Sequence, residues 1–330
     1  MANNNRVFYA CQSVALSDAD DASSKTTQHG VQSVGLNSSF NFEQVFELGQ
    51  IEIYENIEGV PEVEATIERV LDGEATLYEQ FGTQTESNPG ESLLAVGDGQ
   101  KGLVLSVFED DKDSNTGSVQ TGAFMSGMYI GNYSVSINLD GPSTESCSLV
   151  GNHKAWATHA AGNVGADDEP PVAVMKRQSL NTTAGYTTLP NGVAKLQSIS
   201  ISVDFGREDL NELGEKYPFF RAATYPTEVT SEFTYLFDDD QGNPTNDPTI
   251  VGDGGAAVDK LKDVTADKTI KIQLDEINPS NGAATAAYKF NLGAKNRLTG
   301  VSLSGGDAGG GNSTVTYSYS TYNELYAEAV

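Results

Sequence analysis

Basic residues are scarce in this chain of 330 residues, and so are histidine, tryptophan and cysteine. The 19 Lys and Arg residues stand against 46 Asp and Glu residues, which gives a formal net charge of −27. Binding nucleic acid by neutralising phosphates needs clustered positive charge, so this balance excludes that mode of binding. A strongly negative chain stays soluble through self-repulsion and repels other polyanions. Solubility alone would be an equally good explanation of the charge.

Two cysteines, Cys11 and Cys147, permit one disulfide at most and exclude a disulfide framework. We expect two free thiols of a reducing cytosol. No apolar run approaches the length of about 18 residues that a membrane span needs. The N-terminal stretch has no apolar segment behind a basic start, so we expect no secretory signal peptide.

The three histidines are His29, His153 and His159, and none lies in a G-x-S-x-G nucleophile motif. His153 and His159 have no cysteine near them in sequence, which is a poor signature for a metal site. Paired carboxylates carry little information in a chain with 46 acidic residues. We therefore expect no catalytic residue, no metal site and no cofactor.

Two polar loops resemble ligand-binding motifs only in part. The stretch SGGDAGGGN at 304–312 lacks the G-K-[ST] ending of a phosphate-binding loop, and a strand-like pattern follows it. The stretch DDDQGN at 238–243 resembles half of a calcium loop but lacks the distal glutamate. We interpret the first as a turn between strands and the second as a solvated loop.

Alternation of apolar and polar residues runs through most of the chain and is typical of half-buried strands. One example is 61–73, where Val63, Ala65 and Ile67 share one face and the opposite face carries Glu62, Glu64, Thr66 and Glu68. Further strands are expected within 50–57, 103–110, 128–141, 144–156, 196–206, 217–237, 268–277, 286–293, 296–306 and 313–326. The segments 129–139 and 144–156 should form a hairpin around an Asp140-Gly141 turn. The segment REDLNELG at 207–214 predicts a short helix, and FEQVFELG at 42–49 leaves open a helical turn.

About ten strands without a βαβ rhythm predict a mainly β protein. We expect an antiparallel sandwich or barrel with one short flanking α-helix and long hairpins. The chain 1–330 should form a single domain, with an N-terminal arm at 1–30. Polar insertions or loops are expected near 82–102, 157–190 and 238–267.

Four blocks of the sequence resemble phage tail tube (major tail) proteins, in the order that the family has. They cover about half of the chain. The blocks are VQSVGLNSSFNFEQVFELGQIEIYENIEGVPEVEATIERVLDG at 31–73, YIGNYSVSINLDGPSTESCSLVGNHK at 129–154, LQSISISVDFGREDLNELGEKYPFFRAATYPTEVT at 196–230 and LGAKNRLTGVSLSGGDAGGGNSTVTYSYSTYN at 292–323.

The resemblance implies a structural virion protein that assembles with itself and is not an enzyme. Its copies would form hexameric rings that stack into a tail tube, through which the DNA genome passes without sequence-specific binding. The implied partners are a tape-measure protein, tail terminator and baseplate or tip proteins, and a sheath protein where the tail is contractile; no membrane is implied. The implied location is the virion tail, after synthesis in the host cytoplasm.

An acidic lumen would explain the negative net charge, because carboxylates repel phosphates and let DNA slide. The candidate lumen-facing residues are Glu62, Glu64 and Glu68, which share one strand face. A solvent face outside the tube, or salt bridges between rings, are equally good interpretations of them. The competing functions are a secreted or virion-surface module that binds carbohydrate or calcium, a glycan depolymerase, and another virion shell or decoration protein.

Overall fold

The protein is described here from a computed structural model of the chain. The structure describes residues 7–19, 21–109, 112–114, 117–157, 173–182, 185–190, 193, 195–236, 267–277, 284–305 and 311–330. The chain is mainly β, its strand pairs are antiparallel, and the described part contains one α-helix, α1 (Pro89–Asp98). The predicted fold class is therefore confirmed as a mainly β sandwich, and the described strands do not close into a barrel.

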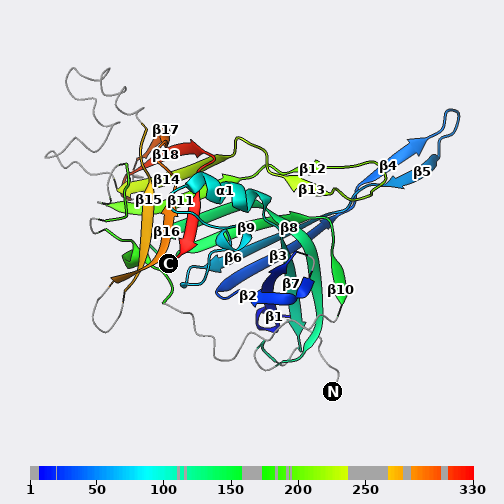
Figure 1. Cartoon of the computed structure of the whole chain (residues 1–330), viewed down its shortest axis with the longest axis horizontal. Coiled ribbons are helices and arrows are strands. Elements are labelled where there is room, and N and C mark those ends of the chain that lie inside the picture. Colours follow the sequence, from blue (N-terminus) through cyan, green and yellow to red (C-terminus); the bar gives the residue numbers. More distant parts are fainter. Residues whose placement is uncertain are drawn as a thin grey trace.

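Eight strands form the largest continuous layer, and each pairs antiparallel with its neighbour (Figure 1). In spatial order they are β3 (Val31–Ser39), β6 (Glu62–Val70), β9 (Thr144–Gly151), β8 (Val119–Asn138), β11 (Leu196–Asp204), β14 (Glu228–Leu236), β18 (Thr314–Tyr322) and β17 (Arg297–Ser304). We call this layer the main sheet.

The 20-residue strand β8 belongs to two layers. Its second half lies in the main sheet, while its first half pairs with β7 on one side and β10 on the other. Gly127, at a φ of +60°, lies between the two halves, where a glycine can adopt the left-handed conformation without strain. The second layer consists of β2 (Asp21–Thr27), β1 (Gln12–Asp18), β7 (Lys101–Phe108), the first half of β8, and β10 (Ala155–Ala157).

One apolar core joins these layers. It contains Leu16 and Leu103 from the second layer and Ile67 from the main sheet, each almost fully buried. A small sheet of β15 (Lys271–Ile277), β16 (Ala284–Asn291) and β19 (Tyr326–Ala329) adds Leu274 and Phe290 to the same core. The remaining elements of the described residues are two strand pairs and three 3-10 turns. The pairs are β4 (Phe42–Phe46) with β5 (Ile53–Glu58) and β12 (Glu208–Leu210) with β13 (Phe220–Ala222), and the turns are η1 (Tyr9–Cys11), η2 (Glu79–Phe81) and η3 (Arg177–Ser179).

The period-two patterns are confirmed where they were strongest. Val63, Ala65 and Ile67 of β6 face the core. The predicted hairpin is β8 with β9, and its turn contains Gly141 at a φ of +98°. Both cysteines are buried free thiols, as expected.

The predicted N-terminal arm is wrong for residues 12–27, which form β1 and β2. Strand β1 pairs with the central strand β7 and buries Val14 and Leu16, so a short apolar run gains a partner that local sequence does not reveal. The predicted insertion at 82–102 is wrong as well, because it contains α1, and Leu93 and Val96 of this helix are fully buried. Pro89 opens the helix at a position that favours proline.

The helix predicted at 207–214 is absent. Residues 208–210 instead form β12, and Leu213 is fully exposed, so this segment has no apolar surface against which a helix could pack. The open alternative at 42–49 is settled as a strand, β4. Residues 158–172 and 183–184 of the predicted insertion at 157–190 and nearly all of the one at 238–267 lie outside the described residues, as do DDDQGN and the middle of SGGDAGGGN. No helix in the described part has the length and apolar character needed to cross a membrane.

Candidate functional site

The face of the main sheet that points away from the core is mostly polar, with Val150, Leu236 and Tyr322 among its apolar members. Adjacent strands place small hydroxyl side chains in register, as in the row Glu68, Ser146, Ser134, Ser202 and Thr230. These groups touch across strands: the hydroxyls of Ser202 and Thr230 lie 2.7 Å apart. We call this surface the polar face. Its other members include Thr66, Ser148, Asn132, Asp204, Ser136, Ser200, Glu232, Ser318, Thr234, Thr316 and Ser302.

Charge on the polar face is almost entirely negative. The carboxylates of Glu64, Glu68, Asp204 and Glu232 lie in its rows. Among the described members of these rows the basic side chain is Arg297 on β17, and its guanidinium pairs with Asp267 at 2.7 Å. The polar face therefore offers an anion no free guanidinium or ammonium group within those rows.

The three candidate acidic residues lie on this face, but they are not equivalent. Glu64 and Glu68 are exposed and accept hydrogen bonds from Asn37 (3.4 Å) and Ser33 (3.3 Å) on β3. Glu62 lies 3.5 Å from the guanidinium of Arg221, which is almost fully buried. Its charge is partly neutralised by that partner, so Glu64 and Glu68 carry the negative potential at this end of the sheet.

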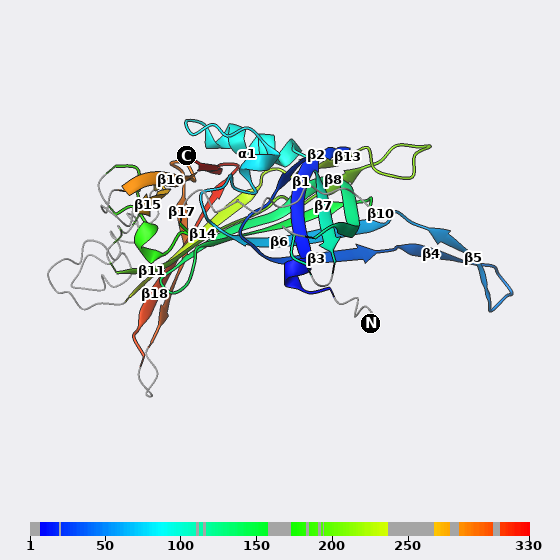
Figure 2. The ribbon, with the colours of Figure 1, turned by 90° about the horizontal axis from the view of Figure 1, so that it is seen from below.

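The hairpin of β4 and β5, residues 42–58, projects from one end of the main sheet (Figures 1 and 2). We call it the arm. The amide of Gly59 donates to the carbonyl of Asn41 at 2.7 Å, so the arm continues the β3–β6 pair beyond the core. Large apolar side chains are exposed along it: Phe42, Phe46, Leu48, Ile51, Ile53, Tyr54 and Ile57. A two-stranded hairpin that buries so little is marginally stable in isolation, which indicates a surface made to be covered.

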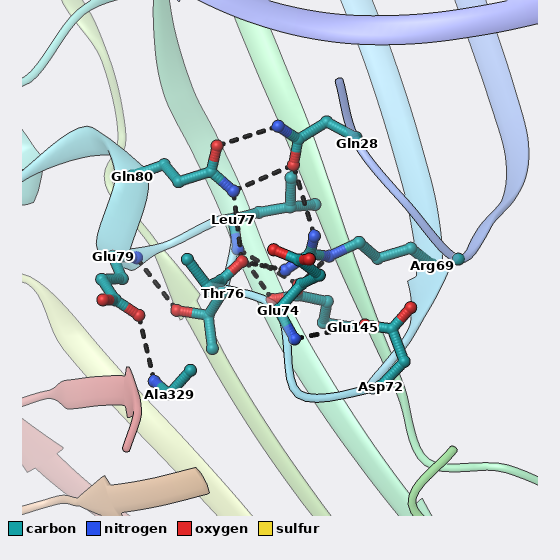
Figure 3. A network of polar contacts seen from close by, with 12 residues as sticks. Gln28, Arg69, Asp72, Glu74, Thr76, Leu77, Glu79, Gln80, Glu145 and Ala329 are labelled. Atoms are coloured by element: carbon teal, nitrogen blue, oxygen red, sulfur yellow. Dashed lines mark hydrogen bonds and ion pairs between the residues drawn. The ribbon is translucent and has the colours of Figure 1, made fainter. Parts of the chain in front are cut away.

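On the core-facing side of the main sheet, Arg69 of β6 and Glu145 of β9 form a buried ion pair (Figure 3). The phenol of Tyr133 donates to Glu145 at 2.8 Å, and the amide of Leu77 donates to the same carboxylate at 3.1 Å. Burial by itself lowers the pKa of Arg69, but attraction to Glu145 and their hydrogen bond raise that pKa above its ordinary value. Burial and Glu145 together raise the pKa of Tyr133 well above its ordinary value.

This network is structural rather than chemically reactive. Arg69 also donates to the carbonyl of Ala75 and, at 3.3 Å, to the amide oxygen of Gln28. The pair therefore fixes the segment that follows β6 against the two sheets. Both charges are fully buried, so neither can meet a substrate in the folded chain.

The histidine candidates form no catalytic set in the part of the chain that the structure describes. Nδ1 of His153 lies 3.1 Å from the hydroxyl of Ser126, but no described carboxylate contacts that imidazole. The dyad borders a pocket of about 340 Å³ that is also lined by Gln100, Tyr129, Asn152, Tyr217, Phe219 and Arg221. His159 lies outside the described residues, and among those described no three His, Cys, Asp or Glu side chains gather as metal ligands.

No protein-family model matches this chain, and no curated protein resembles it at a significant level. The polar face and the arm are therefore the features that bear on function.

The buried pair was not predicted from the sequence, although the two strands contain a signal for it. Arg69 continues the Val63-Ala65-Ile67 face of its strand, and Glu145 shares a face with Cys147 and Leu149. Opposite charges on the apolar faces of two strands mark a buried ion pair once those strands are known to be neighbours.

Proposed function

We propose that this chain is a structural virion protein, the subunit of a phage tail tube, and not an enzyme. Copies join side by side into rings, the rings stack, and the polar face lines the channel that carries DNA. The observation that supports this best is the polar face itself: a broad sheet surface of hydroxyls and carboxylates with no free basic side chain in its described rows.

The two outer strands of the main sheet suit side-by-side assembly. Within the described residues β3 pairs only with β6, and β17 pairs only with β18. Strand β3 has nine residues without proline or charge, and β17 carries one charge, at Arg297. Such long edges without the usual protection against strand pairing favour the addition of another strand.

The strand count also suits a ring. Seven antiparallel steps lead from β3 to β17, so these two edges run in opposite directions. If a neighbouring copy is related by rotation about an axis along the strands, its β3 meets β17 antiparallel. Every copy then uses both edges, and a closed ring leaves no edge free. The resemblance gives six copies per ring.

A channel with this wall would let DNA slide. Phosphates are repelled by Glu64 and Glu68, and the serine and threonine hydroxyls supply no positive charge for counterion-release binding. In this proposal the protein resides in the virion tail after assembly in the host cytoplasm. A tape-measure protein would share the lumen, while terminator, tip or baseplate proteins close the ends and a sheath surrounds a contractile tail.

Sedimentation and electron microscopy of the purified chain test the proposal. Rings or tubes with a central channel are the expected result, and class averages count the copies in each ring. A chain that remains monomeric at high concentration contradicts the proposal.

A second function has one observation in its favour. The pocket beside His153 combines aromatic rings of Tyr217 and Phe219 with amides of Gln100 and Asn152, groups that suit a carbohydrate ring. A monomeric chain whose melting temperature rises with an oligosaccharide would favour this binding module over the tube subunit.

A further inference from the structure

The arm is both apolar and acidic. Residues 42–58 contain five glutamates, Glu43, Glu47, Glu52, Glu55 and Glu58, and no lysine or arginine. At its tip, Leu48 and Ile51 are fully exposed between Glu47 and Glu52. Within the described residues, one ion pair joins a glutamate of the arm to the rest of its own chain, that of Glu58 with Lys216 at 3.4 Å. The tip therefore needs a partner that offers both an apolar hollow and positive charge.

The opposite end of the same molecule offers such a hollow. Ser39 pairs with Glu62 at the arm's end of the main sheet, whereas Val70 pairs with Thr144 at the far end. The β8–β9 turn therefore lies at the end away from the arm. A pocket of about 460 Å³ opens there, lined by Leu139, Asp140, Gly141, Pro142, Lys176, Arg177 and Gln178. We call it the end notch.

The end notch matches the tip in character. Leu139 and Pro142 expose apolar surface beside the exposed side chains of Lys176 and Arg177. Neither basic residue pairs with a carboxylate in the described part of the chain, and Asp140 is the one carboxylate among the lining residues. An acidic apolar tip and a basic apolar notch are thus complementary.

We propose that the arm tip of one copy seats in the end notch of a second copy, with Glu47 and Glu52 beside Lys176 and Arg177. The two surfaces differ and lie at opposite ends of the strands, so the contact is heterologous and repeats along the strand direction. It joins successive rings, while the sheet edges join neighbours within a ring. This inference rests on the proposed function, since it identifies the partner that covers the arm.

Charge reversal tests the pairing in the full-length chain. The first protein carries Lys176→Glu and Arg177→Glu, and the second carries Glu47→Lys and Glu52→Lys. In each protein alone the tip and the notch carry like charges, so tube assembly should need on the order of tenfold more protein or should fail. In an equal mixture every tip finds a notch of opposite charge, so sedimentation and electron microscopy should show tubes again.

A matched control carries Lys112→Glu and Lys295→Glu, two exposed residues that do not line the notch, and should assemble as the native chain does. Circular dichroism establishes that each variant is folded. Tubes of normal length from either reversed protein alone overturn the inference while leaving the tube function intact, and so does a mixture that stays unassembled. Native chains that never associate contradict the inference and the tube function together.

Discussion

At the scale of single residues, the fold depends on charges that the solvent never reaches. Arg69 and Glu145 are buried, and their remaining hydrogen-bonding groups are used by Tyr133, Leu77, Ala75 and Gln28. A buried pair of this kind adds little relative to a well-packed apolar pair, but the loss of one partner leaves an uncompensated charge. Replacing one partner of the pair should therefore cost more stability than replacing both with apolar residues.

Glu145→Ala should lower the free energy of unfolding by about 3–5 kcal/mol, because Arg69 is then buried without its counter-ion. Chemical denaturation of the assembly-free chain measures this loss. The double variant Arg69→Met with Glu145→Leu is the control, and it should be much more stable than the single variant. A single variant as stable as the native chain would contradict the structural role of the pair.

Glu79 gives the unfolding free energy a pH dependence. Burial raises its pKa above the ordinary value of 4.5, and the nearby Glu328 adds to the shift. The folded chain therefore holds this proton more tightly than the unfolded chain does. The resulting stability is complete below pH 4.5 and is lost as pH rises through the raised pKa.

Glu79→Gln should accordingly flatten the decrease in stability above pH 4.5, while its amide oxygen can still accept the hydrogen bond from the Ala329 amide. Thermal unfolding at a series of pH values measures the slope. Identical slopes in the variant and the native chain would show that Glu79 does not cause the decrease in stability.

At the scale of elements, the arm has no buried side chain in either of its strands. Its large apolar side chains are exposed in the single chain, and in the proposed tube a second copy covers those at the tip. Leu48→Ser with Ile51→Ser should change the free energy of unfolding by no more than about 0.5 kcal/mol. The same variant should lose tube assembly in sedimentation experiments.

The matched control for the arm replaces two exposed apolar residues elsewhere, Tyr9→Ser with Leu94→Ser. It should assemble normally. An arm variant that assembles as readily as this control would show that the arm is dispensable.

Some of these strands and helices could be predicted from the sequence, and others could not. Strands such as β6 and β11, with one buried and one solvated face, were predictable because alternation reports that difference directly. Strand β1 was missed because its Val14, Ala15 and Leu16 are all buried, so its two faces do not differ. Helix α1 was missed because Gly90 and Gly97 weaken its helical pattern; a Cβ at Gly97 would clash with the hydroxyl of Tyr225.

The candidate site was predictable only in part, for a related reason. Alternation alone placed Glu64 and Glu68 on a solvated face. The polar face requires the spatial order of eight strands, which depends on long-range pairing such as β14 with β18. The acidic residues of the arm tip can be recognised in the sequence. The end notch cannot, because it depends on the spatial proximity of the β8–β9 turn to Lys176 and Arg177.

At the scale of the whole molecule, the net charge of −27 becomes functional only if much of it faces a channel. Glu64→Lys with Glu68→Lys should leave assembly unchanged and should slow genome ejection, because the wall then attracts phosphates. In purified tubes, co-sedimentation with short duplex DNA should rise at low salt and fall steeply as salt is added.

The control for the channel wall is Glu212→Lys with Glu215→Lys, an equal change of charge on the exposed loop between β12 and β13. It should retain no more DNA than native tubes do. Equal retention by both variants would place Glu64 and Glu68 outside the channel.

The position of the polar face in the assembled particle tests the central claim most directly. A three-dimensional reconstruction of the assembled native chain by electron microscopy should show β3 of one copy beside β17 of the next, with Ser134, Ser202 and Glu64 facing a continuous central channel. A particle in which this face points outward, or in which the main sheets of neighbouring copies do not meet, would contradict it.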